Sequence, residues 1–218
     1  MNKNDLIIRL ETENDYRGTE TLIREAFWNQ NVPGCDEHYL VHTMRQHRDF
    51  VPELAYVIEY GGQLIGCIMY SKAKLVDESG IEKPVLTMGP LCVHPQYQRK
   101  GLSRLLLEHT FEKASELGYD VVINFGNPDN YVARGYKSCM RYNICLEGDI
   151  FPAPLLVKEL HEGALDGRKR IYSPSDIDAA CADTEAVARF DSQFPPKKKA
   201  WQPSQEEFFI HSHSILRG

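Results

Sequence analysis

The chain has 218 residues, 42% of them hydrophobic, and a formal net charge of −6 at pH 7. A protein of this charge lacks the basic face that neutralises phosphates, so nucleic-acid binding is not expected. The hydrophobic fraction supports a sizeable core, whereas no apolar stretch is long enough to span a membrane. The one basic run, Lys197–Lys199, follows two prolines and is interpreted as a solvated loop.

Six cysteines are scattered along the chain without a Cys-x-x-Cys pair, and several lie inside apolar segments. This pattern favours buried, reduced thiols over a disulfide framework or a zinc site. His211 and His213 form no metal site by themselves, because no third ligand is near them in the sequence. The first residues also lack the apolar core of a signal peptide. We therefore expect a cytoplasmic protein without a bound metal.

The first 80 residues predict a short strand, two helices and a β-hairpin. Asp and Asn oxygens in Thr12–Asp15 can cap the first helix, and Asn31–Gly34 ends it. Gly61 and Gly62 separate two apolar runs and can both adopt positive φ, which is typical of a hairpin turn. In chain order the elements are a strand at 6–10, a helix between Asp15 and Asn31, a helix at 36–47, and strands at 53–60 and 63–73.

Residues 84–108 predict a strand, a tight turn and a helix. The run Val85–Val93 is apolar and uncharged, as a strand buried on both faces should be. Pro95 stops it, because proline has no N–H to donate to a neighbouring strand. From Leu102 the pattern is that of an amphipathic helix, with Arg104 and Glu108 placed as an i,i+4 pair on the wet face. The residues expected on its buried face are Leu102, Leu106, Thr110, Ala114 and Leu117.

The turn between this strand and helix has the properties of an anion site. The first N–H groups of a helix have no intrahelical partner and carry partial positive charge. Gly101 lacks a side chain where an anion must approach the backbone, and Arg99 and Lys100 add full charges beside it. We interpret the turn as a phosphate site at a helix N-terminus. An ordinary strand-to-helix turn with a solvated basic pair is the alternative.

The turn, Gln98-Arg99-Lys100-Gly101-Leu102-Ser103, resembles the Gln/Arg-x-x-Gly-x-Gly/Ala signature of the GNAT superfamily, the acetyl-CoA-dependent N-acetyltransferases. In that family the loop holds the pyrophosphate of the cofactor. The preceding strand, here Leu91, Cys92 and Val93, lies along its pantetheine arm. Ser103 departs from the usual Gly or Ala, but serine is small enough to preserve the loop. The resemblance implies that all these residues bind acetyl-CoA.

A second motif lies at the distance usual for this family. Asp120–Phe125 predicts a short buried strand, and Gly126–Asp129 turns it into a short helix with Pro128 near its first turn. The following Tyr131–Tyr136 resembles the Tyr-x-x-x-Gly-Phe/Tyr element of GNAT proteins. The resemblance implies that Tyr131 points at the coenzyme sulfur and that Asn124 bonds the cofactor. The alternatives are a packing aromatic and an ordinary strand-end asparagine.

The resemblance implies an α+β fold in which a mixed, largely antiparallel sheet is splayed at the cofactor strand and flanked by helices. We assign residues 1–160 to this acetyltransferase domain. Residues 161–218 form a C-terminal extension packed on the same domain, similar to extensions of some bacterial members with unassigned substrates. Within the C-terminal part we predict strands at 143–150 and 155–160. A helix is predicted at 176–188, with Ser173 or Ser175 near its cap.

The implied activity is transfer of an acetyl group from acetyl-CoA to a primary amine of a small molecule or peptide, by direct attack. The competing hypothesis is a non-catalytic acyl-CoA sensor of the same fold. Both a monomer and a homodimer are compatible with the sequence.

Transfer needs a neutral amine, donors for the oxyanion and a proton for the thiolate. Tyr131 is the candidate acid, since a phenol with a pKa of about 10 is protonated at pH 7. Backbone N–H groups of Leu91–Val93 are the candidate oxyanion donors, and Gly89-Pro90 is the expected distortion beside them. Cys92 alternates away from its neighbours and is interpreted as core. The base is left open among His94, Glu25, Glu37 and His38.

Overall fold

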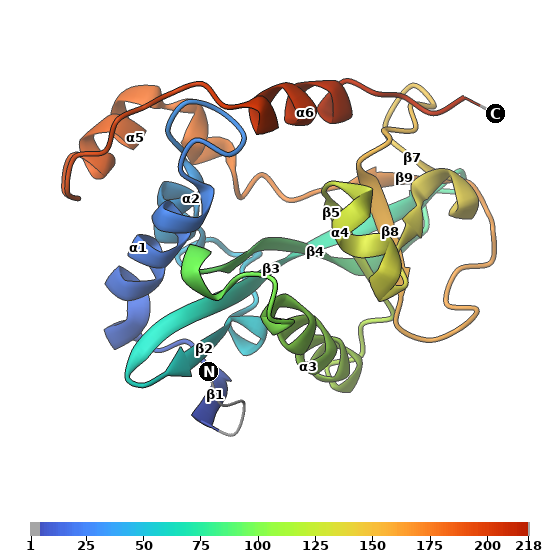
Figure 1. Cartoon of the computed structure of the whole chain (residues 1–218). Helices are drawn as coiled ribbons and strands as arrows, with labels where there is room; N and C mark the ends of the chain where they lie inside the picture. Colours follow the sequence, from blue (N-terminus) through green and yellow to red (C-terminus); the bar gives the residue numbers. More distant parts are fainter. Residues whose placement is uncertain (1–4, 218) are drawn as a thin grey trace.

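Residues 5–217 of the computed structural model form a mixed β-sheet flanked by helices (Figure 1). Within this range the strands are β1 (Leu6–Leu10), β2 (Tyr56–Tyr60), β3 (Gln63–Asp77), β4 (Glu82–Val93), β5 (Val121–Phe125), β6 (Lys137–Ser138), β7 (Ile144–Cys145), β8 (Leu155–Glu159) and β9 (Arg170–Ser173). The α-helices are α1 (Tyr16–Phe27), α2 (Glu37–Met44), α3 (Leu102–Glu116), α4 (Pro128–Tyr131), α5 (Thr184–Asp191) and α6 (Pro203–Ser212). Residues 1–4, which bear on the signal-peptide interpretation, lie outside the described range.

The sheet is mixed and largely antiparallel, as the sequence predicts. Its strand order is β1-β2-β3-β4-β5-β8-β6, with β9 pairing with the far half of β3 and β7 pairing with β9. Among the paired strands only β4–β5 and β7–β9 are parallel in the described part of the chain. The β2–β3 turn is the predicted one, because Gly61 and Gly62 have φ of 58° and 78°. The expected α+β fold is therefore confirmed.

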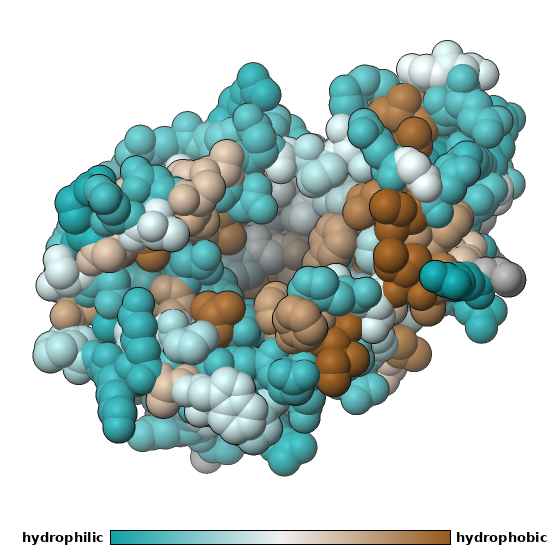
Figure 2. All heavy atoms as spheres, turned by 90° about the horizontal axis from the view of Figure 1, so that it is seen from above, coloured by the Kyte–Doolittle hydropathy of each residue, from teal (hydrophilic) through white to brown (hydrophobic). Residues whose placement is uncertain are grey.

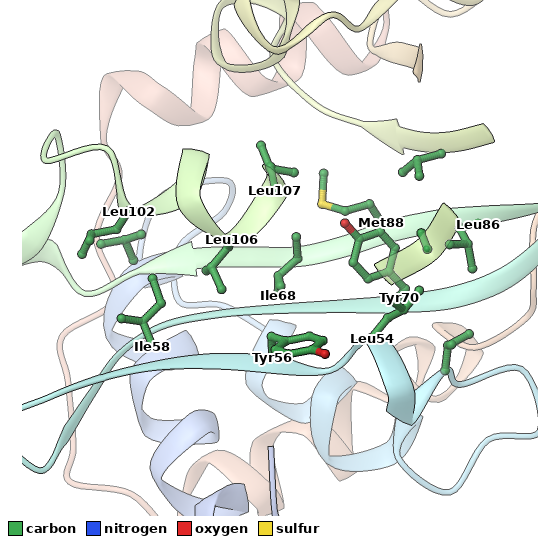
Figure 3. Close-up of a cluster of buried hydrophobic side chains, with 14 of the residues drawn as sticks. Leu54, Tyr56, Ile58, Ile68, Tyr70, Leu86, Met88, Leu102, Leu106 and Leu107 are labelled. Carbon is green, nitrogen blue, oxygen red and sulfur yellow. The ribbon is translucent and has the colours of Figure 1, made fainter. Parts of the chain in front are cut away.

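Helix α3 covers one face of the sheet through its predicted apolar stripe. Leu102 and Leu106 are fully buried and pack in a cluster with Ile68 and other strand residues (Figure 3). The Tyr70 hydroxyl lies 2.7 Å from Thr110 Oγ1, so the buried phenol has a polar partner. Leu117, which was expected on the same stripe, is instead the C-cap and is 47% exposed. The stripe ends one turn earlier than predicted because the helix ends at Glu116.

Helices α1 and α2 cover the opposite face of the sheet. Ile23 and Val41 pack there with Val57, Met69 and Cys92. Cys92 therefore belongs to the core on the face away from α3, as its alternation in the sequence predicts. The two faces of the central strands are thus both buried, which explains their nearly continuous apolar sequence.

Two adjacent strands of the sheet diverge before the chain reaches the turn at Gln98–Ser103, which we call the phosphate turn. Strands β4 and β5 pair only at Leu86–Val122 and Thr87–Ile123, although β4 continues to Val93. The β3–β4 register also shifts, since Ile68 faces Leu91 whereas Tyr70 faces Met88. The extra β4 residue thus lies at Gly89-Pro90, where the distortion was predicted. This divergence leaves the end of β4 without a neighbouring strand on the β5 side.

Two predictions for the C-terminal part are wrong in their bounds. The predicted strand at 143–150 is reduced to β7, because Gly148 and Asp149 adopt positive φ and turn the chain. The predicted helix at 176–188 begins only at Thr184, where Asp183 caps it by accepting from the Ala186 N–H. A separate 3-10 turn precedes it at Ala179–Ala182.

The expected cap residues have other roles. Ser173 ends β9, and Ser175 Oγ donates to Asp49 Oδ2 at 2.7 Å. The sequence analysis assigns no element to β9 or α6, and these two complete the C-terminal part. Among residues 5–217, no helix has both the length and the apolar character that crossing a membrane requires.

Candidate active site

The phosphate turn has the backbone geometry that an anion site needs. Gly101 is the N-cap of α3 and has φ of 83°, in the left-handed region that favours glycine. A Cβ on this residue would meet no atom within 4 Å, so the space in front of its backbone is open. Arg99 also has positive φ, 61°, which makes the turn tight and brings its backbone round towards the helix start. The first turn of α3, whose N–H groups have no intrahelical partner, borders the cavity described next.

A cavity of about 550 Å³ lies against this turn and extends along the end of β4. It is bordered by the end of α1 on one side and by α4 on the other, and Figure 2 shows the molecule hollowed between these two sides. The predicted site residues that line it are Leu91, Cys92, Val93, Gln98, Arg99, Gly101, Leu102, Ser103 and Tyr131. The two predicted motifs, about 30 positions apart in the sequence, thus border one cavity.

Two predicted site residues do not line the cavity. Lys100 turns back, donating from Nζ to the Gln96 carbonyl at 3.1 Å and lying over the Tyr97 ring at 5.0 Å. Asn124 is buried and is not among the residues that line the cavity. Of the basic pair, only Arg99 therefore borders the space expected for the pyrophosphate.

Asn124 and Tyr131 come together around Gly126. A Cβ on Gly126 would lie 2.5 Å from Tyr131 Cε2 and 3.0 Å from Asn124 Nδ2, so only glycine fits between them. Asn124 is 1% exposed, and neither polar atom of its side chain has a hydrogen-bond partner in the described structure. Burial raises the pKa of Tyr131 above its ordinary value, and the neighbouring Asn124 side chain opposes this in part. Leaving a buried amide unpaired is costly, so Asn124 is a candidate for bonding a group that the structure does not contain.

The end of β4 offers backbone groups to the cavity. The His94 N–H donates to the Ile65 carbonyl at 2.9 Å, which fixes the side of β4 that faces β3. Because bonding alternates along antiparallel strands, Leu91 and Val93 direct their N–H and C=O groups away from β3, towards the divergence. Gln98 Nε2 donates to the Val93 carbonyl at 3.2 Å and so ties the turn to the strand.

The four candidate bases differ strongly in their surroundings. His94 caps the 3-10 turn after β4 by accepting from the Gln96 N–H, and it does not line the cavity. Glu25 is paired with Lys197 at 2.8 Å. His38 is fully buried 3.1 Å from Asp191, and burial lowers its pKa to about 4. These contacts give His94, Glu25 and His38 structural roles.

Glu37 is the candidate that titrates near neutral pH. Burial raises its pKa to about 7, with Asp36 adding to the effect. Its Oε1 accepts from Asn31 Nδ2 at 2.9 Å, and Asn31 lines the cavity. A carboxyl with this pKa is matched to proton transfer at physiological pH.

Seven further residues that line the cavity were not predicted from the sequence. Four of them come from the end of α1 and the following loop, and three residues from α4 and its continuation lie opposite. These residues are Ala26, Phe27, Gln30 and Asn31 on one side and Asp129, Asn130 and Arg134 on the other. The helix break at Asn31–Gly34 is the one local signal for the first group, since chain breaks beside a cofactor strand often carry sites.

The fold and the cavity define an α+β protein in which the start of a helix borders a cavity beside two diverging parallel strands. Residues 21–137 match the model of the acetyltransferase (GNAT) family, which is more than half of the chain. The chain belongs to this family and is an acyltransferase by class.

Relatives and solved structures agree with this assignment. The chain is 27% identical over 162 residues to the uncharacterised N-acetyltransferase YhbS of Escherichia coli, which covers 74% of this chain and 92% of YhbS. The crystal structure of YhbS in complex with CoA superposes with a TM-score of 0.69 at 24% identity, covering 80% of this chain and 92% of YhbS. A GNAT family acetyltransferase from Brucella melitensis in complex with acetyl-CoA gives a TM-score of 0.60 at 20% identity, covering 79% and 97%. At these identities the structures show the shared fold.

Proposed function

We propose that this protein is an N-acetyltransferase that transfers the acetyl group of acetyl-CoA to a primary amine of a small molecule or peptide by direct attack. The proposal is supported by family membership and by the CoA and acetyl-CoA complexes of the two structural neighbours. The single observation that carries it is that the phosphate turn and Tyr131 border one cavity, at the point where β4 and β5 diverge.

The residues present fit acetyl-CoA. The open space in front of Gly101, the N–H groups of the first turn of α3 and the Arg99 guanidinium suit a pyrophosphate. The outward-facing backbone of Leu91 and Val93 suits the amide groups of a pantetheine arm, which would lie in the divergence. The unsatisfied Asn124 amide, deep beside Tyr131, is a further group that we assign to the cofactor.

In the proposed reaction the amine nitrogen attacks the thioester carbonyl carbon, and the C–S bond then breaks. Backbone N–H groups at the end of β4 stabilise the oxyanion. The Tyr131 hydroxyl gives its proton to the leaving thiolate, because a phenol with the ordinary pKa of about 10 is protonated at pH 7. Glu37 is our candidate for taking the amine proton, directly or through one water.

We also propose that residues 161–218 belong to the same structural unit as residues 1–160. Strand β9 pairs with β3, and Arg24 on α1 bonds Asp191 at 2.6 Å. The run Lys197–Lys199, interpreted from the sequence as a solvated loop, docks on α1: Trp28 Nε1 donates to the Lys198 carbonyl at 3.0 Å. We expect this unit to function in the cytoplasm, where the six free cysteines would stay reduced.

The experiment that tests the function is release of free thiol from acetyl-CoA in the presence of a panel of amines. We expect amine-dependent release by the full-length protein, with acetylated amine as the second product. Thermal stabilisation by acetyl-CoA without release with any amine would contradict the enzyme and support the acyl-CoA sensor.

A further inference from the structure

Two cysteines face each other on neighbouring strands, one of which borders the cavity. Cys67 on β3 is the register partner of Cys92 on β4, and their Sγ atoms lie 3.4 Å apart. Both thiols are free and buried. An S–S bond is about 2.0 Å long, so the two sulfurs would have to approach by about 1.4 Å to form one. The pair is therefore placed for thiol–disulfide chemistry.

One of these two thiols belongs to the cavity. The structure describes all six cysteines of the chain, and Cys92 is the one among them that lines the cavity. Cys92 also packs in a cluster with Ala26 and Phe27, which border the same space from α1. Cys67 is fully buried and does not line the cavity. A molecule in the cavity therefore meets Cys92 first, and Cys67 is the thiol beside it.

The end of β4 that carries Cys92 is also where the sulfur of the coenzyme is expected. The proposed pantetheine arm runs along Leu91 and Val93, the residues on either side of Cys92. Tyr131, which is proposed to protonate the coenzyme thiolate, lines the same cavity. A coenzyme bound in this way brings its sulfur into the space that Cys92 borders. The inference below rests on this proposed binding of the coenzyme and does not depend on acetyl transfer.

The surroundings of the two thiols suit them to different steps. The neighbouring Cys92 thiol and burial raise the pKa of Cys67 well above its ordinary value. Because a thiol attacks a disulfide as its thiolate, Cys67 is poorly suited to attack a disulfide in solution. It can attack a disulfide formed on Cys92, since a reactant held next to its target reacts far faster than a free one. Cys92 is thus the thiol that meets a substrate, and Cys67 is the thiol that resolves the product.

We propose that Cys92 and Cys67 form a dithiol that reduces disulfides of coenzyme A bound in the cavity. The Cys92 sulfur attacks the coenzyme sulfur, the S–S bond of the substrate breaks, and the leaving thiolate takes the proton that Cys92 releases. The product of this step is a mixed disulfide between Cys92 and CoA. Cys67 then attacks the Cys92 sulfur, and its proton goes to the CoA thiolate, which leaves as CoASH. Two electrons pass from the dithiol to the substrate, so each reduced chain reacts once and ends with a disulfide between Cys67 and Cys92.

The test uses CoA disulfide, in which two CoA molecules are joined through their sulfurs, and the reduced full-length protein without an amine. We expect release of two CoASH per chain, loss of two of the six thiols, and a digestion product that joins Cys67 to Cys92. Glutathione disulfide lacks the nucleotide and should react at least about tenfold more slowly. Excess acetyl-CoA should slow the reaction with CoA disulfide, because it occupies the cavity. Equal rates with the two disulfides, or loss of thiols outside this pair, overturn the proposal.

Three variants assign the two steps. Cys67→Ala should stop after the first step, with one CoASH released and one CoA held on Cys92 until a reductant is added. Cys92→Ala should react at least about tenfold more slowly than the parent. Cys139→Ala is the matched control and should react like the parent, because Cys139 is fully buried and does not line the cavity.

Calorimetry with acetyl-CoA checks that each variant is folded and binds the coenzyme. A parental rate in Cys92→Ala, or complete oxidation of the other cysteines in Cys67→Ala, contradicts the proposed dithiol. The expected oxidation without acetylation of any amine contradicts only the proposed catalysis. Acetylation of an amine without oxidation by CoA disulfide contradicts only the dithiol.

Discussion

At the scale of single residues, the site depends on keeping one proton on a phenol. A phenol with the ordinary pKa of about 10 is protonated at pH 7 and can donate to a thiolate, and burial raises the pKa of Tyr131 further. Its ring is held 5.5 Å from the Tyr136 ring in an edge-to-face contact, and Gly126 leaves room for it. Ring packing therefore positions the Tyr131 hydroxyl, whereas the pKa of the phenol keeps it protonated.

Tyr131→Phe should slow the chemical step and leave cofactor binding nearly unchanged. The variant removes one oxygen and keeps the packed ring. Loss of a general acid costs roughly 10²- to 10⁴-fold in rate, whereas affinity for acetyl-CoA should change by less than about tenfold. Single-turnover rates and calorimetric affinities on an accepted amine measure both. Tyr136→Phe is the control, since its buried hydroxyl has no partner in the described structure; equal rates for the Tyr131 variant and the parent would refute the acid role.

Glu37→Gln should change how stability depends on pH. The folded-state pKa of Glu37 is raised from 4.5 to about 7, so the folded protein holds a proton that the unfolded chain releases. Stability is therefore lost as pH rises from about 4.5 to about 7, by an amount on the order of 3 kcal/mol. Gln removes this loss, so the free energy of unfolding of the variant, measured by urea titration between pH 5 and 8, should fall less than that of the parent.

The same variant tests the proposed base. If Glu37 takes the amine proton, the acidic limb of the pH–rate profile near pH 7 should disappear together with most of the rate. If the variant gains stability above pH 7 but keeps the parental pH–rate profile, Glu37 is not the base and is a carboxyl that destabilises the folded protein.

At the scale of elements, the turn between β4 and α3 combines a backbone conformation that favours glycine with open space that a ligand could occupy. Gly101 needs positive φ and also leaves its front open, so a β-branched substitution would combine strain with steric exclusion. Asparagine tolerates the left-handed region better than other residues with a side chain, so it isolates the second effect.

Gly101→Asn should therefore fold normally and bind acetyl-CoA at least about tenfold more weakly, because its side chain occupies the space assigned to the pyrophosphate. The matched control is Gly62→Asn in the β2–β3 hairpin, where φ is 78° and the space is also open. Calorimetry on both variants checks the expectation. Parental affinity in Gly101→Asn would mean that the anion binds elsewhere.

The packing of α1 against α2 includes a buried ion triad. Arg45 on the C-cap of α2 bonds Glu11 at 2.8 Å and Glu20 at 3.0 Å, and all three side chains are at most 5% exposed. Arg45→Met would remove the cation that Glu11 pairs with, whereas Glu20 would keep Arg17 at 3.4 Å; breaking such a buried pair typically costs about 3–5 kcal/mol. Arg104→Met, in the exposed pair with Glu108, should cost less than about 1 kcal/mol. If the urea midpoints of the two variants differ little, water has replaced the guanidinium of Arg45.

At the scale of the whole molecule, sequence patterns predict individual turns, helices and hairpins, whereas they do not predict which distant segments come into contact. The turn at Gln98–Gly101, the α3 stripe and the β2–β3 hairpin follow from residue patterns within a few turns of chain. Strand β9 was missed because four residues with a polar start carry little periodicity, and its pairing with β3 comes from tertiary contact. The wall at Gln30 and Asn31 was missed because only the fold brings it opposite Tyr131.

The thiols provide a test of the whole structure. Five of the six cysteines are buried, and Cys181 is half-buried with its pKa raised by burial to about 12. Without reductant, six thiols should titrate after denaturation, whereas in the native protein all should react slowly and Cys181 first. Cys67 Sγ and Cys92 Sγ lie 3.4 Å apart, so a count of four would point to a bond between this pair. Rapid native reaction of several thiols would contradict the buried core.

The pairing of β9 with β3 also sets an order of assembly during synthesis. Lys74 faces Ser173, so β3 waits for about a hundred further residues before its second half gains this neighbour. Contacts of such long sequence separation form late, since closing the loop costs entropy before the contact stabilises it. Strands β1–β5 and α3 leave the ribosome before β9. We therefore expect the nascent chain to form the turn and the strands that border its cavity before the second half of β3 gains β9 as a neighbour.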